Sequence, residues 1–231
     1  MRILVAEDEK NLNRLIVSRL TEEHYSVDAC FDGGEAMAYL ESAEYDAVVL
    51  DIMMPGEHDG LAVCKELRRR NPSIGIILLS ARSQEMDKVS GLMMGADDYV
   101  TKPSPPRSWW PGSDAVYRRV ALAAGRREGG ARDELTSGEF TLNLRNRSFL
   151  KGKRPIELTQ VEFQIMEYFF SHPGVALARG DILKHVWGAG YTGEEKIVDV
   201  NIRRLRMKVE EEPSSPRHIV TVWGLGYRWD E

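Results

Sequence analysis

Side chains that could handle a phosphoryl group follow the apolar stretches of the first hundred residues. Glu7 and Asp8 follow the first stretch, Asp51 the third, Ser80 the fourth and Lys102 the fifth. Three carboxylates in one crevice repel one another, so a cation must hold them together. A hard divalent ion with oxygen ligands, Mg²⁺, meets that need, and Lys102 adds a fixed positive charge. An aspartate beside such an ion suits nucleophilic attack on a phosphoryl group, whose oxygens the metal, Lys102 and Ser80 would bind.

A parallel sheet is the element that would bring these residues together. Short apolar stretches alternate with segments of helical periodicity, which is typical of a doubly wound α/β fold. In such sheets functional groups gather beyond the carboxyl ends of the strands. The expected strands are Ile3–Ala6, Val27–Cys30, Ala47–Leu50, Ile74–Leu79 and Asp98–Val100, and the expected helices are Asn11–Glu23, Gly34–Ser42, Gly60–Arg70 and Gln84–Met94.

Four stretches, VAEDE, VVLDIMMPG, LLSAR and GADDYVTKP, resemble the receiver domain of bacterial two-component response regulators. The resemblance implies a flavodoxin-like, five-stranded parallel sheet and transfer of a phosphoryl group from a sensor histidine kinase to Asp51. It also implies that Asp8, Asp51 and the backbone carbonyl of Met53 bind Mg²⁺, with Glu7 assisting through water.

Three further positions match functional residues of that family. Ser80 and Tyr99 correspond to a switch pair, in which the hydroxyl turns toward the phosphoryl group and the ring moves inward. Lys102 corresponds to the phosphate-binding lysine. The segment PGEHDG departs from the pattern, because it has one residue more than usual between Pro55 and Gly60. This departure puts the rate of dephosphorylation in question more than the chemistry.

A phosphatase of the haloacid-dehalogenase type is an alternative from another class, since it also forms an aspartyl phosphate. Such hydrolases need a second aspartate, two positions after the nucleophile, as general acid. Met53 occupies that position here and cannot transfer a proton. The sequence therefore favours a phosphoryl acceptor over a turnover enzyme.

The last hundred residues combine short alternating strands with three helices and a hairpin. Thr159 and Glu162 form a capping box at the start of the first helix. The second helix is expected over Arg179–Trp187 and the third over Glu195–Val209. The hairpin, or wing, is expected from His218–Val222 paired with Tyr227–Trp229 across a Trp-Gly-Leu-Gly turn.

The third helix has one narrow apolar stripe, made of Val198, Ile202, Leu205 and Val209. Basic and polar side chains are expected away from that stripe or on its flanks: Asn201, Arg204 and Lys208, and Lys196, Arg203 and Arg206. A helix anchored by one face and offering arginine and lysine elsewhere suits the major groove of DNA.

The helix and the hairpin together resemble the winged-helix effector domain of OmpR/PhoB-class response regulators. The resemblance implies that Arg204 reads a base. It implies DNA-backbone contacts for Lys196, Asn201 and Thr221, and the remaining expected DNA-binding residues are Arg203, Lys208 and Arg228.

The same resemblance implies further partners. The loop Gly188–Glu194 matches a segment that contacts RNA polymerase. Trp223 stands where several relatives place a minor-groove arginine, so minor-groove readout is not assumed here. Phosphorylation would make receivers pair as a homodimer and bring two winged helices onto tandem half-sites of promoter DNA.

Charge and composition support two domains. Acids exceed bases by 19 to 11 in residues 1–103, whereas bases exceed acids by 20 to 17 in the remainder. We expect a receiver over 1–120, a linker over 121–134 and a winged-helix domain over 135–231. No apolar run is long enough for a membrane span. Cys30 and Cys64 are expected as reduced core residues of a cytoplasmic protein.

The segment 104–114, SPPRSWWPGSD, interrupts the expected fifth receiver helix with three prolines. Two compensating frameshifts would convert the family's usual helix sequence into this one without a length change, and we treat that as a hypothesis. The sequence predicts a DNA-binding transcriptional response regulator controlled by phosphorylation of Asp51. The alternative is a phosphorylation-independent DNA-binding regulator with a degenerate receiver, made more credible by this segment.

Overall fold

The computed structural model describes residues 2–80, 90–102, 134–189, 191 and 194–231. The chain divides into two compact units, residues 1–120 and 121–231. The atypical segment 104–114 and almost all of the expected linker lie outside the described residues. Among the described residues, no helix is both long and apolar enough to cross a membrane.

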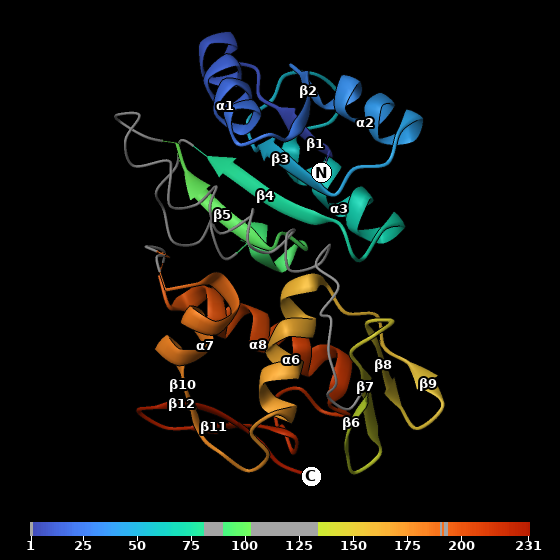
Figure 1. The fold of residues 1–231 in the computed structure, drawn as a ribbon, viewed down its shortest axis with the longest axis vertical. Helices are drawn as coiled ribbons and strands as arrows, with labels where there is room; N and C mark the ends of the chain where they lie inside the picture. Colours follow the sequence, from blue (N-terminus) through green and yellow to red (C-terminus); the bar gives the residue numbers. More distant parts are fainter. Residues whose placement is uncertain (1, 81–89, 103–133, 190, 192–193) are drawn as a thin grey trace. The chain divides into compact units, whose positions relative to one another are not determined.

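The first unit is built on a five-stranded sheet in which every pairing is parallel (Figure 1). The strand order is β2-β1-β3-β4-β5, the doubly wound order of flavodoxin-like folds. The expected parallel sheet is therefore confirmed. Its strands are β1 (Arg2–Ala6), β2 (Ser26–Cys30), β3 (Ala47–Asp51), β4 (Gly75–Ser80) and β5 (Asp98–Thr101).

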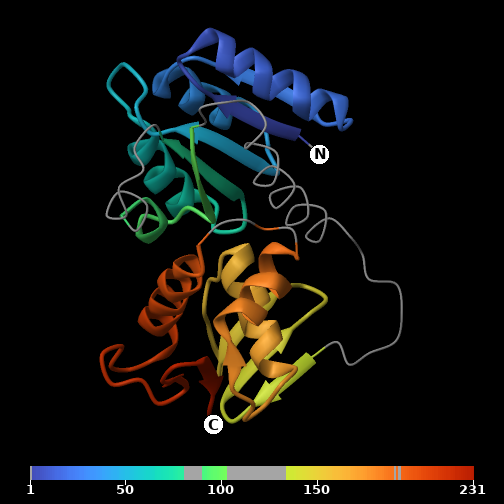
Figure 2. The same ribbon diagram turned by 90° about the vertical axis from the view of Figure 1, so that its left-hand side faces the viewer.

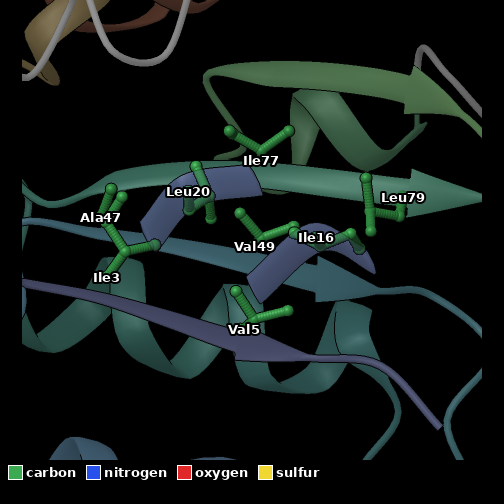
Figure 3. Packing of buried hydrophobic residues seen from close by; sticks show 8 residues of the cluster. All are labelled: Ile3, Val5, Ile16, Leu20, Ala47, Val49, Ile77 and Leu79. Carbon is green, nitrogen blue, oxygen red and sulfur yellow. The ribbon is translucent and has the colours of Figure 1, made fainter. Parts of the chain in front are cut away.

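Alternate residues of each strand point to the same side of the sheet, so their apolar side chains form one continuous face. This face packs against α1 (Lys10–Glu22). Ile16 and Leu20 of α1 meet apolar side chains from three neighbouring strands. Figure 3 shows α1 in front of the sheet and another helix behind it. The strand residues in this cluster are Ile3, Val5, Ala47, Val49, Ile77 and Leu79.

Two further helices of the first unit begin at, or one residue before, the positions that the sequence predicts. Helix α2 spans Gly33–Ser42, α3 spans Gly60–Arg70, and the two helices contact each other. Residues 90–93 are helical and the first part of the expected fourth helix lies outside the described residues. Helix α3 begins directly beside the end of β3, where a Cβ on Gly60 would lie 2.0 Å from the backbone oxygen of Asp51. Only glycine fits this approach.

Over its described residues, the second unit contains three helices and two small sheets. Helix α6 (Gln160–Phe170) contacts α7 (Arg179–Trp187), α8 (Lys196–Val209) and strands of both sheets (Figures 1 and 2). The first sheet is antiparallel, in the order β6-β7-β8-β9; the second has the order β10-β12-β11. The strands are β6 (Glu134–Ser137), β7 (Phe140–Asn143), β8 (Ser148–Lys151), β9 (Arg154–Pro155), β10 (Leu177–Ala178), β11 (Ile219–Val222) and β12 (Gly226–Trp229).

Two sequence expectations about this unit are confirmed in detail. The capping box is complete: the Thr159 hydroxyl accepts from the backbone N–H of Glu162, and the Glu162 carboxylate accepts from the backbone N–H of Thr159. The wing is an antiparallel hairpin of β11 and β12, with Thr221 opposite Tyr227. Its turn contains Gly224 at a φ of 77°, a conformation that favours glycine.

Candidate functional site

The carboxyl ends of β1 and β3 bring three carboxylates together in the first unit. Glu7 and Asp8 directly follow β1, and Asp51 is the last residue of β3, the neighbouring strand. Each residue offers an oxygen within 4.8 Å of the others. Glu7 and Asp51 are fully buried, whereas Asp8 is exposed. This cluster, Glu7, Asp8 and Asp51, is called the acidic pocket below.

Lys102 closes the acidic pocket from the end of β5. Its Nζ donates to Glu7 Oε1 at 2.6 Å and to Asp51 Oδ2 at 2.8 Å. Its backbone N–H donates to the carbonyl of Ser80 at 2.6 Å, which fixes the lysine beside the end of β4. The other oxygen of Asp51 accepts from the backbone N–H of Met53 at 3.1 Å. Both oxygens of the buried Asp51 carboxylate are thus held in place.

Burial and repulsion make the acidic pocket electrostatically demanding. Burial raises the pKa of Glu7 to about 7; the Lys102 ammonium opposes that rise, and repulsion from Asp51 adds to it. Burial also raises the pKa of Asp51, against the hydrogen bonds from Lys102 and Met53. Burial alone would lower the pKa of Lys102, but its hydrogen bonds to Asp51 and Glu7 raise it overall. One ammonium does not balance three carboxylates.

The acidic pocket has the donor set that a hard divalent cation requires. Glu7 Oε2 is buried and has no hydrogen-bond partner among the described residues. Leaving a buried carboxylate oxygen unsatisfied is costly, so such an atom points to a missing partner. Carboxylate oxygens converging within a few ångströms suit Mg²⁺.

The remaining predicted receiver residues lie around the acidic pocket or on the strand beside it. Ser80 is buried at the end of β4, next to the strand that carries Tyr99. Tyr99 is half-buried, and its ring lies near Gly91, where an added Cβ would meet it at 3.7 Å. Met53 directs its backbone toward Asp51 while its side chain is 55% exposed.

The buried face of α8 is wider than the sequence indicates. The expectation that Asn201 and Arg204 lie away from the buried stripe is wrong, because both side chains are buried. The Asn201 amide donates to the carbonyl of Ile197, and Arg204 Nε lies 3.1 Å from Glu162 Oε1. A helical wheel cannot anticipate this, because the carboxylate that accommodates a buried guanidinium comes from another helix.

Lys208, the third residue expected away from the stripe, is exposed as expected, but its ammonium bonds within the unit. Its Nζ donates to Glu162 Oε2 at 2.6 Å and to the carbonyl of Glu157 at 2.8 Å. Glu162 therefore caps α6 and meets two cations of α8. The capping box in the sequence identifies the first role of Glu162 but gives no signal for the second.

The other expected DNA-binding residues lie on the exposed side of α8 and on the wing. Lys196 and Arg203 are exposed. On the wing, Thr221 is half-buried and its hydroxyl accepts from Arg206, while Arg228 forms a two-point ion pair with Asp230. The loop expected to contact RNA polymerase, 188–194, is only partly within the described residues. Trp223 at the wing turn is 92% exposed.

Comparison with known families identifies both units. Residues 3–109 match the family described as response regulator receiver domain, and residues 153–229 match the family described as transcriptional regulatory protein, C terminal. The chain belongs to the response regulators, in the class that joins a receiver to an OmpR/PhoB-type DNA-binding domain.

Individual relatives match over nearly the whole chain. The chain is 40% identical over 227 residues to the sensory transduction protein RegX3 of Mycolicibacterium smegmatis, covering 98% of this chain and 97% of the relative. A mutant of RitR superimposes with a TM-score of 0.78 at 25% identity, over 100% of this chain and 99% of that one. DrrB, an OmpR/PhoB homologue from Thermotoga maritima, gives 0.51 at 25% identity over the same shares.

These findings establish a DNA-binding transcriptional response regulator. Its two domains imply a sensor kinase and promoter DNA as partners. Members of this family typically act by binding DNA and not as turnover enzymes.

Proposed function

We propose that Asp51 accepts the phosphoryl group through which a sensor histidine kinase controls this regulator. The observation that carries the proposal is the double engagement of its carboxylate, by Lys102 at 2.8 Å and by the backbone of Met53 at 3.1 Å. In the transfer, the N–P bond of the kinase phosphohistidine breaks and an O–P bond to Asp51 forms. These contacts orient the carboxylate before the donor arrives.

Glu7, Asp8 and Asp51, with the backbone carbonyl of Met53, are the residues that would hold Mg²⁺. The ion would supply positive charge that neutralises phosphoryl oxygens. Lys102 is already placed against Asp51, so its ammonium can follow the charge onto the phosphoryl group. Ser80 ends the neighbouring strand, where its hydroxyl would donate to a phosphoryl oxygen.

Phosphorylation adds a charge of roughly −1.5 to −2 at Asp51. Ser80 and Tyr99 would transmit that change from β4 to β5. The two strands are joined at this point, because Ser80 pairs with Thr101 and its carbonyl accepts from the backbone N–H of Lys102. Receivers then pair as homodimers and place two winged helices on tandem half-sites of promoter DNA. RNA polymerase is the further partner, at the loop 188–194, and the regulator acts in the cytoplasm.

The DNA-contacting residues that we propose differ from those expected at first. Lys196 and Arg203 are exposed on α8, and Thr221 and Arg228 are the wing residues. Arg204 and Lys208 instead pair with Glu162 of α6, and the Asn201 amide bonds within α8. Most of the affinity should come from phosphate contacts and weaken as salt rises.

The acidic pocket favours this function over both alternatives. A degenerate receiver would lack one or more of the charged groups, yet Glu7, Asp8, Asp51 and Lys102 meet within hydrogen-bonding and ligand distances. A hydrolase would need a proton donor at position 53, and methionine has none.

The phosphoacceptor is tested by substituting Asp51→Asn and measuring labelling by acetyl phosphate in the presence of Mg²⁺. We expect labelling to disappear. The matched control is Asp59→Asn at the N-cap of α3, where asparagine caps as well as aspartate, and which should label normally. Label retained on the Asp51 variant would move the acceptor to another residue.

A further inference from the structure

Arg206 is half-buried at the edge of the exposed side of α8. From that position alone, one would expect its guanidinium to contact a DNA phosphate. Its guanidinium is instead directed at the wing. Nε and Nη2 donate to the carbonyl of Ile219 at 2.9 and 2.6 Å, and Nη2 also donates to Thr221 Oγ1 at 2.8 Å. The guanidinium also lies over the ring of Tyr227, 5.5 Å from its centroid. Arg206 is thus bound to both strands of the hairpin.

The residue that caps the carboxyl end of α8, Glu210, binds the same part of the wing. Glu210, one helical turn after Arg206, accepts from the backbone N–H of Ile219 at 2.7 Å and of His218 at 2.9 Å. Its other oxygen accepts from the N–H of Arg217 at 3.0 Å. Ile219 is therefore held at its N–H by a carboxylate and at its carbonyl by a guanidinium. Sliding β11 along α8 in either direction breaks one of these charge-assisted bonds.

The bond to Thr221 also decides what its hydroxyl can do. A threonine hydroxyl has one proton to donate and two lone pairs that accept. Arg206 occupies one lone pair, so the hydroxyl proton is left to point elsewhere. A DNA phosphate only accepts hydrogen bonds. Arg206 thus favours the orientation in which Thr221 can donate to a phosphate.

We infer that Arg206 is a positioning residue for DNA binding: it fixes the wing against α8 and orients the Thr221 hydroxyl as a donor to a DNA phosphate. It acts through Thr221 and not by its own contact with the duplex. This inference rests on the proposed DNA-binding function and assigns to Arg206 a role different from that of Arg203, its exposed neighbour on the same helix.

A double-mutant cycle in the full chain tests the inference. The affinity of wild type, Arg206→Met, Thr221→Val and the double variant is measured for a duplex selected by the wild-type chain from a random pool. We expect each single variant to lose about tenfold and the double variant to lose about the same, because both remove one coupled unit. An additive loss of about a hundredfold would overturn the inference, as would no loss from Thr221→Val.

The salt dependence gives an independent readout. A direct phosphate contact by a cation contributes about one unit to the slope of log affinity against log salt. Arg206→Met should leave that slope unchanged, whereas the same substitution at Arg203 should reduce it by about one. A reduced slope in the Arg206 variant would make Arg206 a phosphate contact and contradict the inference.

Two controls separate misfolding and a wrong proposed function from a wrong inference. Hydrogen exchange of α6 and α8 shows whether Arg206→Met remains folded at the binding temperature. Thr221→Val removes the hydroxyl but keeps the shape of the side chain, so a loss of affinity in this variant does not arise from misfolding. If neither Arg203→Met nor Lys196→Met weakens binding, the proposed DNA face is wrong. If they weaken it and the cycle is additive, only the role of Arg206 is wrong.

Discussion

Glu7 in the receiver and Glu162 in the winged-helix unit are both fully buried glutamates, and their surroundings are opposite. Around Glu7, the described residues place three carboxylates with one ammonium, that of Lys102. Around Glu162, two cations of α8 meet one carboxylate, which also caps α6.

The difference separates a site with surplus negative charge from one whose charges are compensated within the fold. At Glu162, one buried oxygen also lacks a hydrogen bond in the described part of the chain, but it lies 3.1 Å from Arg204 Nε. The other oxygen accepts from Lys208 and from the backbone of Thr159, so the fold supplies opposite charge, as buried ions require. At Glu7, an oxygen has no hydrogen-bond partner among the described residues, and one ammonium faces three carboxylates. A carboxylate whose charge the fold leaves uncompensated is a better sign of function than burial or a shifted pKa alone.

The largest expected effect distinguishes the two glutamates directly. Glu162→Gln keeps a side chain suited to the capping box but leaves Arg204 and Lys208 without their carboxylate. We expect it to lower the free energy of unfolding of the winged-helix unit by about 3 kcal/mol. Hydrogen exchange of α6 and α8 measures this locally.

The matched control is Glu7→Gln, which removes surplus negative charge from the acidic pocket. It should not destabilise the receiver, because less repulsion remains around Asp51. If both substitutions cost the same stability, the contrast between the two sites is wrong.

Magnesium should act on one unit only. A ligand that binds only the folded state at a hundred times its dissociation constant stabilises by about 2.7 kcal/mol. Thermal or chemical unfolding of the receiver should therefore shift upward with Mg²⁺, while the winged-helix unit should not respond. The shift should shrink strongly in Asp8→Asn. An equal response in that variant would place the ion elsewhere.

The smallest effect that we expect separates two adjacent arginines. Arg204→Met should destabilise the winged-helix unit by about 2 kcal/mol, less than the change at Glu162, because Lys208 still meets the carboxylate. Arg203→Met, on the exposed side, should change stability by no more than about 0.5 kcal/mol while weakening DNA binding. Chemical unfolding and a binding isotherm for each variant test this, and reversed outcomes would restore Arg204 as the residue facing DNA.

The acidic pocket could be predicted from the sequence because one rule places its members. The carboxyl ends of parallel strands share an edge, so Glu7, Asp51 and Lys102 were expected to meet from their positions along the chain alone. The wider buried face of α8 could not be predicted, because it depends on Glu162, which lies 42 residues before Arg204 in the chain and reaches it only after α6 and α8 pack. The same limit applies to Arg206, whose partners on β11 come from a separate element.

The close approach of Gly60 to Asp51 bears on the extra residue in PGEHDG. Gly60 pins the end of that loop, and a Cβ on Gly33 would lie 1.9 Å from the backbone oxygen of His58, so the loop also rests on the start of α2. Residues 55–59, which include His58 and lead up to Gly60, are nevertheless exposed. Added length is thus taken up at the rim, where it can alter which molecules reach Asp51, while the carboxylate itself stays in register with its lysine.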